Sequence, residues 1–451
     1  MRRVRLPVSA AEAFAWHERP GSLERLIPPW DRVQVIERPG GIRDGARVVL
    51  GLGRFRFRWE FEQRDVIAGR QFLDIQVRGP FRRWNHLHEF HAVAESQCDL
   101  EDTIEYALPM GAPGRIVAGP AVRRAIERHL SYRHRVTAQD LAAHAATAEG
   151  ALRIAVSGAS GLIGSSLVSF LAAGGHEVLR LVRRAPRVPS EAEWNPAAGF
   201  ARPEALEGLD AVVHLAAASI ASGRWTARRR QLIRDSRVAG TERLAGALAR
   251  LSRPPRALIA ASAVGYYGNR GDEILREESE AGRGFLPDLG TDWEVAAAPA
   301  ERAGVRVVHM RIGIVLTPAG GALARLLVPF RLGLGGPFGD GRAWWSWIAL
   351  DDVLGLVHLA LTHDGLRGPV NAVAPGAVRN AEFTRALGLA LGRAAPFRVP
   401  AFALRAALGD LADETLLASA RVEPARALAA GYPFRFPALA EALAHLLGRR
   451  E

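Results

Sequence analysis

The chain has 451 residues, of which 49% are hydrophobic and 24% charged, a composition typical of a globular protein with two or three domains. Its formal net charge is +12, but all 59 basic residues are arginines scattered along the chain, and we therefore expect no nucleic-acid partner. Cys98 is the single cysteine, and neither a secretory leader nor a membrane-spanning run is evident. These features predict a cytoplasmic protein without membrane contact.

Residues 1–147 combine short alternating segments with one long amphipathic segment. Two short helices are expected at 7–14 and 23–27. Alternation between turn residues then predicts strands at 33–37, 46–52, 55–61, 71–77, 86–93 and 99–107. Apolar residues at helical spacing, including Val122, Ile126 and Leu130, predict a long helix over about 117–144. We expect an α+β domain in which an antiparallel sheet precedes a long helix.

Strands and helices alternate after a small, polar stretch at 145–150, which we expect to be a linker. Strands are predicted at 153–157, 177–182, 211–215, 257–261, 305–311 and 370–371, and a helix follows the first of them to about residue 173. This alternation predicts a doubly wound parallel Rossmann sheet over 151–395. From 396 to 451 the sequence is rich in Ala and Leu, which predicts a small C-terminal helical domain ending in a helix at 439–447.

A glycine-rich turn joins the first of these strands to its helix. Candidate cofactor-binding residues in it are Gly158, Ser160, Gly161, Leu162, Ile163 and Gly164. Gly158 permits a tight turn, Gly161 lets the backbone approach a pyrophosphate, and Gly164 lets the helix pack closely on the strand. The helix N-terminus then offers free N–H groups to the phosphates. A plain glycine-rich loop is the alternative. Leu215 and Ala216, which end a later strand, are further candidates for this site.

The end of the second strand bears on the choice of nucleotide. A site for NAD(H) normally has Asp or Glu there to accept hydrogen bonds from the ribose 2′-hydroxyl. Here Arg183 and Arg184 follow the strand, and they are suited to pair with a 2′-phosphate. We therefore expect NADP(H) rather than NAD(H), with two solvated arginines as the alternative.

Several separated motifs resemble one superfamily. The motifs are Gly158-x-x-Gly161-x-x-Gly164, 214–220, Arg224-Trp225, 235–241, 262–268, Trp293-Glu294, 311–316, 329–337, Trp347-Ile348 and 371–375. Together they resemble the atypical extended short-chain dehydrogenases/reductases of the NAD-dependent epimerase/dehydratase or nucleoside-diphosphate-sugar epimerase group. The resemblance covers about residues 152–448 and implies a Rossmann domain completed by a short helical domain on the substrate side.

Residues 1–147 resemble a second family, the SRPBCC or START-like helix-grip domains. The segments that carry this resemblance are 81–90, 102–109 and 132–134. Such domains curl an antiparallel sheet around a long C-terminal helix and leave a cavity for an apolar ligand. The resemblance therefore implies an apolar small molecule as a ligand of this domain.

The usual catalytic pair of the superfamily is absent. Typical members use Tyr-x-x-x-Lys and a Ser, in which the Lys assists the Tyr in proton transfer. This chain contains no lysine, and the resemblance places Leu286 and Gly290 at the two positions. Ser262 is a candidate both for catalysis and for cofactor binding, although Ala263 fits the Ser position slightly better. Tyr266 and Tyr267 are further catalytic candidates, and pocket lining is favoured over an acid/base role for them.

Other polar and aromatic residues allow two interpretations each. Arg311, at the end of a strand, binds an anionic group of the cofactor or forms a buried ion pair. Trp344, Trp345 and Trp347 follow a glycine-rich loop at 333–341 and form a substrate lid or ordinary packing. Asp351 lies at an expected helix start, where a cap is favoured over a catalyst.

Three histidines of the first domain raise the question of a metal. His86 and His88 share one face of a predicted strand, and His91 falls on the other. No carboxylate or cysteine in the sequence pattern completes a set of ligands, so we expect pocket lining or exposure and no metal.

The sequence thus predicts an NADP(H)-binding, epimerase/dehydratase-like oxidoreductase acting on a small molecule, joined to an apolar-ligand-binding domain. The alternative is a non-catalytic NADP(H)-dependent sensor of redox state or ligand. The substrate, the reaction direction and the oligomeric state do not follow from the sequence.

Overall fold

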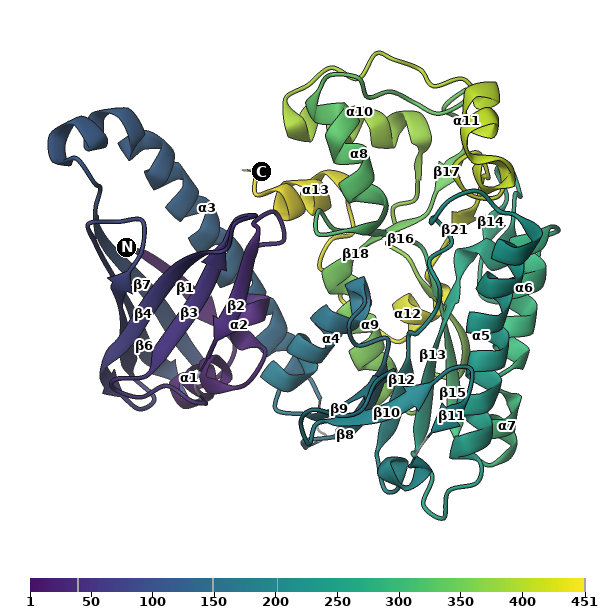
Figure 1. The fold of residues 1–451 in the computed structure, drawn as a ribbon, viewed down its shortest axis with the longest axis horizontal. Helices are drawn as coiled ribbons and strands as arrows, with labels where there is room; N and C mark the ends of the chain where they lie inside the picture. The colour runs from purple at the N-terminus through teal and green to yellow at the C-terminus, as the bar shows by residue number, and fades with distance from the viewer. Residues whose placement is uncertain (39, 148–149, 201, 450–451) are drawn as a thin grey trace. The chain divides into compact units, whose positions relative to one another are not determined.

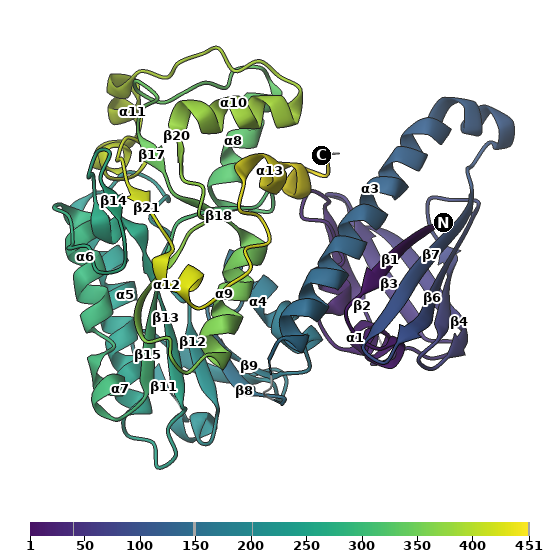
Figure 2. The same ribbon diagram turned by 180° about the vertical axis from the view of Figure 1, so that it is seen from behind.

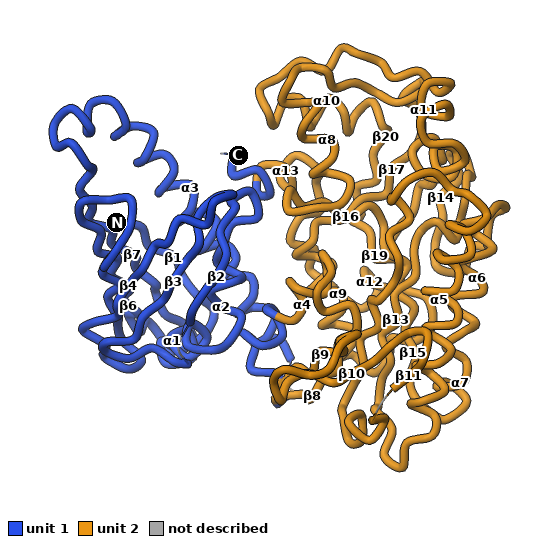
Figure 3. The backbone as a smooth tube through the Cα atoms, viewed as in Figure 1, with its two compact units in different colours: residues 1–150, 169–176, 445–450 blue, residues 151–168, 177–444, 451 orange. Residues whose placement is uncertain are grey.

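The computed structural model describes residues 1–38, 40–147, 150–200 and 202–449, so residues 148–149 of the expected linker lie outside the described residues. The chain divides into two compact units, coloured separately in Figure 3. Unit 1 comprises Met1–Gly150, Ser169–His176 and His445–Arg450, and unit 2 comprises Ala151–Val168 and Glu177–Ala444.

Unit 1 is built on an antiparallel sheet that, over the described residues, has seven strands in the order β1-β7-β6-β5-β4-β3-β2 (Figure 1). The strands are β1 (Arg2–Leu6), β2 (Val33–Glu37), β3 (Arg47–Leu52), β4 (Phe57–Ile67), β5 (Gln71–Arg78), β6 (Arg83–Ala94) and β7 (Gln97–Ala107). The helices are α1 (Ala10–Glu18), α2 (Ser22–Arg25) and α3 (Gly111–Ala145). The predicted antiparallel sheet followed by a long helix is confirmed.

Helices α1 and α3 pack on the sheet through apolar side chains. Phe14 of α1, Phe90 of β6 and Leu141 of α3 belong to one buried cluster. Helix α1 begins where the Ser9 side chain accepts a hydrogen bond from the Glu12 N–H, the usual N-cap interaction. These contacts close α3 over one face of the sheet, as in a helix-grip fold.

Strand β1 was not predicted, because three of its five residues are arginine. Its charges are paired across the strands, with Arg3 bonded to Glu101 and Arg5 to Asp99 of β7. The prediction for β4 was also misplaced, since the strand starts at Phe57 rather than 55 and continues to Ile67. Pairing with neighbouring strands forms β1 and lengthens β4, and the local sequence pattern does not show this pairing.

Unit 2 contains the parallel sheet, whose order over the described residues is β11-β10-β9-β8-β12-β13-β15-β19. Apart from the antiparallel β11, the pairs are parallel, which gives the Rossmann order 3-2-1-4-5-6 with β11 and β19 added at the two edges. The strands are β8 (Arg153–Ser157), β9 (Glu177–Val182), β10 (Glu191–Asn195), β11 (Gly199–Phe200), β12 (Ala211–His214), β13 (Ala257–Ala263), β15 (Arg306–Ile312) and β19 (Gly368–Ala372). The predicted doubly wound sheet is confirmed, although β10 was not foreseen.

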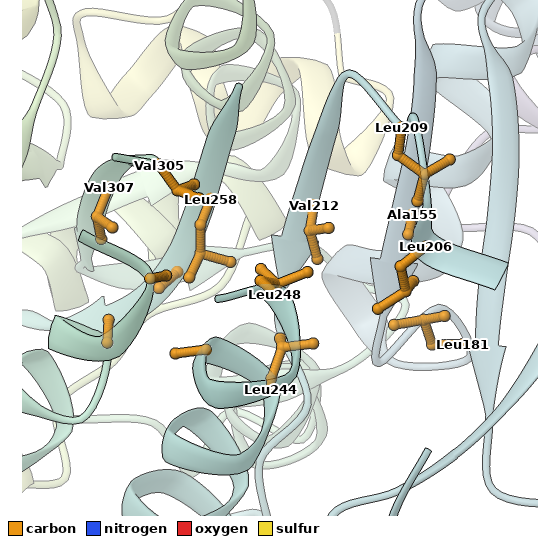
Figure 4. Packing of buried hydrophobic residues seen from close by; sticks show 14 of the residues in the cluster. Ala155, Leu181, Leu206, Leu209, Val212, Leu244, Leu248, Leu258, Val305 and Val307 are labelled. Carbon is orange, nitrogen blue, oxygen red and sulfur yellow. The ribbon is translucent and has the colours of Figure 1, made fainter. Parts of the chain in front are cut away.

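Helices cover both faces of this sheet, with α5 (Ala227–Leu248) and α9 (Leu350–Thr362) on opposite sides (Figures 1 and 2). Leu244 and Leu248 of α5 point toward Val212 of β12 and Leu258 of β13 (Figure 4). The remaining helices that frame the sheet are α4 (Leu162–Ala173), α6 (Phe285–Val295) and α7 (Ala298–Arg302). The strands are therefore buried on both faces, as their apolar runs require.

The C-terminal part of unit 2 is largely helical, and its helices begin before residue 396, where the small helical domain was expected to start. It contains α8 (Gly321–Arg331), α10 (Asn380–Leu391), α11 (Ala401–Leu408), a π-helical turn (Ala412–Leu416), α12 (Ala425–Ala429) and α13 (Leu439–Leu447). Short strands tie this part together: β14 (Ile274–Leu275) with β21 (Arg421–Val422), β16 (Ile314–Leu316) with β18 (Trp347–Ala349), and β17 (Trp344–Trp345) with β20 (Val378–Arg379). None of the helices in the described residues is both long and apolar enough to span a bilayer.

Candidate functional site

The glycine turn lies between β8 and α4, and two of its three glycines leave no room for a side chain. Gly158 has a φ of +69°, and a Cβ atom there would lie 2.9 Å from the Ala216 nitrogen. At Gly164 an added Cβ would lie 2.1 Å from the Gly158 carbonyl oxygen, whereas Gly161 is exposed. The turn and the first N–H groups of α4, which have no partner within a helix, therefore present a bare backbone edge suited to a pyrophosphate.

Buried Ser157 ties the turn to the neighbouring strand. Its hydroxyl lies 2.7 Å from Nδ1 of His214, and it accepts hydrogen bonds from the N–H groups of Leu215 and Ala216 at 3.1 and 3.3 Å. Burial lowers the pKa of His214 to about 4, so the imidazole is neutral. The structure thus brings Leu215 and Ala216 beside Gly158, as the predicted cofactor site requires.

The two arginines after β9 have different surroundings. Arg184 makes a two-pronged ion pair with Glu191, at 2.8 Å for each bond, and Glu191 also accepts the Arg187 N–H. These hydrogen bonds lower the pKa of Glu191 to about 2. Arg183 is exposed. Glu191 lies on the unforeseen strand β10, and no pattern in the sequence indicated that it would hold Arg184.

A row of polar residues crosses the carboxyl ends of three strands of the parallel sheet. Ser262 of β13, Arg311 of β15 and Asn371 of β19 are neighbours in register. Arg311 donates two 2.8 Å bonds to Glu294 of α6, which also accepts the Ser262 hydroxyl at 2.7 Å. Arg311 is therefore in a buried ion pair, one of the two alternatives for it. With Tyr267, these residues form what we call the polar network.

The two adjacent tyrosines play different parts. Tyr267 is fully buried; its hydroxyl donates to Asn371 Oδ1 at 2.7 Å and accepts from Arg311 at 2.9 Å. Burial raises the pKa of Tyr267 to about 12. Tyr266 is only partly buried, and the Arg311 guanidinium lies 3.5 Å from its ring centroid. Tyr267 is thus bound into the network, and Tyr266 lies beside the network with its side chain partly exposed.

The two positions of the missing Tyr-x-x-x-Lys pair lie on α6 and are filled by packing. A Cβ added at Gly265 would touch Leu286 at 3.3 Å. A Cβ added at Gly290 would lie 3.2 Å from Cα and Cβ of Tyr266. Tyr266 therefore lies against the site where a lysine side chain would start, and the positive charge near the ring comes from Arg311 instead.

Two other predicted residues proved to be structural. Trp345 and Trp347 are buried, at 3% and 0% exposure, in β17 and β18, which favours packing over a lid. The guanidinium groups of Arg379 and Arg421 lie 4.5 and 4.6 Å from the ring centroid of Trp344.

The expectation that Asp351 caps a helix was wrong. The N-cap of α9 is Ala349, and Asp351 lies buried in the first turn. A carboxylate there still interacts favourably with the helix dipole.

In unit 1 the histidine faces are as predicted, but the judgement that no carboxylate accompanies them was wrong. His86 and His88 point inward and are buried, and His91 is exposed. Asp102, on the next strand, is paired in register with His88. Sequence spacing could not show this, because the two residues are brought together by strand pairing.

Comparisons with known proteins agree with this architecture. Residues 154–372 match the NAD dependent epimerase/dehydratase family, residues 6–130 match polyketide cyclase/dehydrase and lipid transport proteins, and residues 399–446 match a domain of unknown function, DUF1731. An epimerase family protein of Mycobacterium tuberculosis is 46% identical over 296 residues, which cover 66% of this chain and 98% of that protein.

Crystal structures of similar proteins agree with these matches. A nucleoside-diphosphate sugar epimerase from Corynebacterium glutamicum has a TM-score of 0.82 and 31% identity, covering 99% of this chain and 89% of its own. Human epimerase family protein SDR39U1 (isoform2), solved with NADPH, has a TM-score of 0.61 and 36% identity, covering 65% of this chain and 99% of its own. The chain belongs to the NAD dependent epimerase/dehydratase family.

Proposed function

We propose that unit 2 binds NADP(H) at the Gly158–Gly164 turn and uses it in redox or epimerisation chemistry on a small molecule. The observation that carries the proposal is the bare backbone edge of this turn, where side chains at Gly158 and Gly164 would collide with the chain. Bound there, the cofactor would supply or accept the hydride. The human relative solved with NADPH supports the same choice of nucleotide.

Arg183 is the residue that we assign to the 2′-phosphate. It is exposed at the end of β9, whereas Arg184 is held by Glu191 and fixes the loop that follows the strand. An arginine whose fork is already occupied by a carboxylate has fewer donors to offer a phosphate. Phosphate recognition therefore depends mainly on Arg183, with Arg184 positioning the loop.

Tyr266 is the proton donor or acceptor that we propose. Its hydroxyl makes no hydrogen bond to the described residues, and its ring lies under the Arg311 guanidinium. Ser262 and Tyr267, the other candidates, have their hydroxyl protons directed to Glu294 and Asn371. Of the three, Tyr266 alone is thus available to a substrate at the carboxyl edge of the sheet, where ligands of such folds bind.

A non-catalytic sensor of NADP(H) is the second candidate. It is favoured by the lack of lysine in the sequence and by the packing of Tyr266 against Gly290. Turnover distinguishes the two. Oxidation of NADPH with a panel of carbonyl and sugar-nucleotide substrates, abolished in Tyr266→Phe and retained in an exposed control such as Arg187→Ala, supports the enzyme. Binding without turnover across the panel supports the sensor.

Nucleotide preference is tested by titrating the full chain with NADPH and NADH. We expect NADPH to bind at least about tenfold more tightly, and Arg183→Ala to remove about 1.4 kcal/mol of that preference. The affinity for NADH should be unchanged in this variant. Arg187→Ala, which removes an exposed arginine side chain of the same loop and keeps the Arg184–Glu191 pair, is the matched control and should not weaken NADPH binding. Equal affinities for the two nucleotides, or an Arg183→Ala variant that binds NADPH normally, contradict the assignment.

For unit 1 we propose binding of an apolar small molecule. The inward face of its sheet carries aromatic rings in contact, with Trp59 and Phe61 centroids 4.7 Å apart and Phe81 and Trp84 centroids 4.7 Å apart. The match to polyketide cyclase and lipid transport proteins supports this role. Mass spectrometry of the native, purified chain should find an apolar compound that is lost when Trp84 is changed to Ala.

A further inference from the structure

The interior of unit 1 contains a cluster of ionisable side chains that the proposed function does not use. His86 and His88 lie on one face of β6, and Asp102 lies on β7 directly opposite His88. Their exposures are 4%, 1% and 2%. We call these three residues the histidine cluster. Burying two imidazoles and a carboxylate in one place is costly unless their polar atoms are satisfied.

The donor atoms of the histidine cluster converge on one point. Oδ1 of Asp102 lies 3.0 Å from Nε2 of His86 and 2.6 Å from Nδ1 of His88, and one donor atom from each residue lies within 4.8 Å of the others. Ligands of a tetrahedral zinc ion are separated by about 3.3 Å, given bonds of about 2.0 Å. Shifts of a few tenths of an ångström would therefore open the cluster to an ion.

The pairing of His88 is incomplete. Neither of its ring nitrogens makes a hydrogen bond to the described residues, although both are buried. The 2.6 Å approach of Nδ1 to Asp102 thus lacks the direction of a hydrogen bond. This distance is shorter than the separation of two zinc ligands, so a bound ion would hold the two atoms about 0.7 Å farther apart.

A second layer of residues holds the cluster from outside. His134 of α3 has Nε2 2.6 Å from the other carboxylate oxygen of Asp102. Asp74 of β5 has Oδ2 3.6 Å from Nε2 of His88, on the side away from Asp102. Carboxylates and imidazoles in these positions orient metal ligands and fix their tautomers. The two carboxylates also place two negative charges beside the buried histidines.

We propose that His86, His88 and Asp102 bind a zinc ion, with Asp74 and His134 orienting them. Two imidazoles and one carboxylate suit zinc, whose charge offsets that of Asp74 and Asp102. Three protein ligands leave a fourth position for water or for a polar group of a ligand. Trp84 lies two residues before His86 on the same face of β6, so a compound bound at the aromatic rings would lie beside that position.

The test is zinc binding to the untagged full chain after treatment with a chelator. We expect about one zinc ion per chain, and affinity at least about tenfold lower in His86→Gln and in His88→Gln. His91→Gln, on the opposite, exposed face of the same strand, is the matched control and should bind as the wild type does. Zinc should also raise the unfolding temperature of the wild type and of His91→Gln only.

Cobalt(II) provides a readout that does not depend on whether the variants fold. Bound to the wild-type chain, it should show the visible absorption bands of a four-coordinate nitrogen and oxygen site, and zinc should remove them. Wild-type protein that binds neither ion overturns the proposal. So does binding that is equal in His86→Gln, His88→Gln and His91→Gln, or cobalt that binds without these bands.

Discussion

The polar network of unit 2 and the histidine cluster of unit 1 are both buried, but they differ in how completely their polar atoms are paired. In the network, the Arg311 nitrogens, both Glu294 oxygens and the Tyr267 hydroxyl all have hydrogen-bond partners. In the cluster, the ring nitrogens of His88 lack them among the described residues. A completely paired group of residues fixes a scaffold, whereas an incompletely paired one indicates where a ligand completes the set.

The largest effect is expected from breaking the network at Arg311. Arg311→Met leaves Glu294 buried without its cation, which should lower the free energy of unfolding of unit 2 by about 3–5 kcal/mol. Urea denaturation measures this. The double variant Arg311→Met with Glu294→Gln removes the uncompensated charge and should recover most of the loss. A single variant as stable as the double variant would show that the network is not a scaffold.

A pH titration tests whether a buried imidazole with one unpaired ring nitrogen affects the stability of the fold. Nε2 of His214 has no hydrogen-bond partner in the described part of the chain, and the folded pKa is about 4, below the unfolded value of about 6.5. The unfolded state therefore binds the proton more tightly. Stability should be complete above pH 6.5 and fall by about 3 kcal/mol as the pH drops to 4.

The comparison of wild type with His214→Asn isolates this contribution from the titration of carboxylates. Asn retains a polar atom near Ser157 but cannot be protonated in this range. The variant should show a smaller loss of stability between pH 6.5 and 4, measured by urea denaturation at each pH. Identical slopes would mean that His214 is not responsible.

A smaller difference in the free energy of unfolding is expected between the variants of the two tyrosines. Tyr267→Phe leaves Asn371 Oδ1 without the hydroxyl donor, and should lower the free energy of unfolding by about 1–3 kcal/mol. Tyr266→Phe should change it by no more than about 0.5 kcal/mol, because the Tyr266 hydroxyl makes no hydrogen bond to the described residues. Equal effects would contradict the distinct roles given to the two side chains.

The sequence by itself determined the local secondary-structure elements and the absence of the usual catalytic pair. Apolar runs and their spacing predicted most strands of both sheets, and the glycine spacing predicted the turn at Gly158–Gly164, because these depend on neighbours along the chain. The absence of lysine was enough to exclude the usual catalytic pair. Strands β1 and β10 escaped prediction because charged residues interrupt their apolar pattern.

Only the tertiary structure decided which polar residues meet. Glu191 reaches Arg184, Glu294 reaches Arg311, and Asp102 faces His88, each pair joined by strand register or by a helix packed on a sheet. Register is set by the burial of whole faces rather than by the paired residues themselves. For that reason the nucleotide-binding turn was visible in the sequence, while the partners of Arg184, Arg311 and His88 were not.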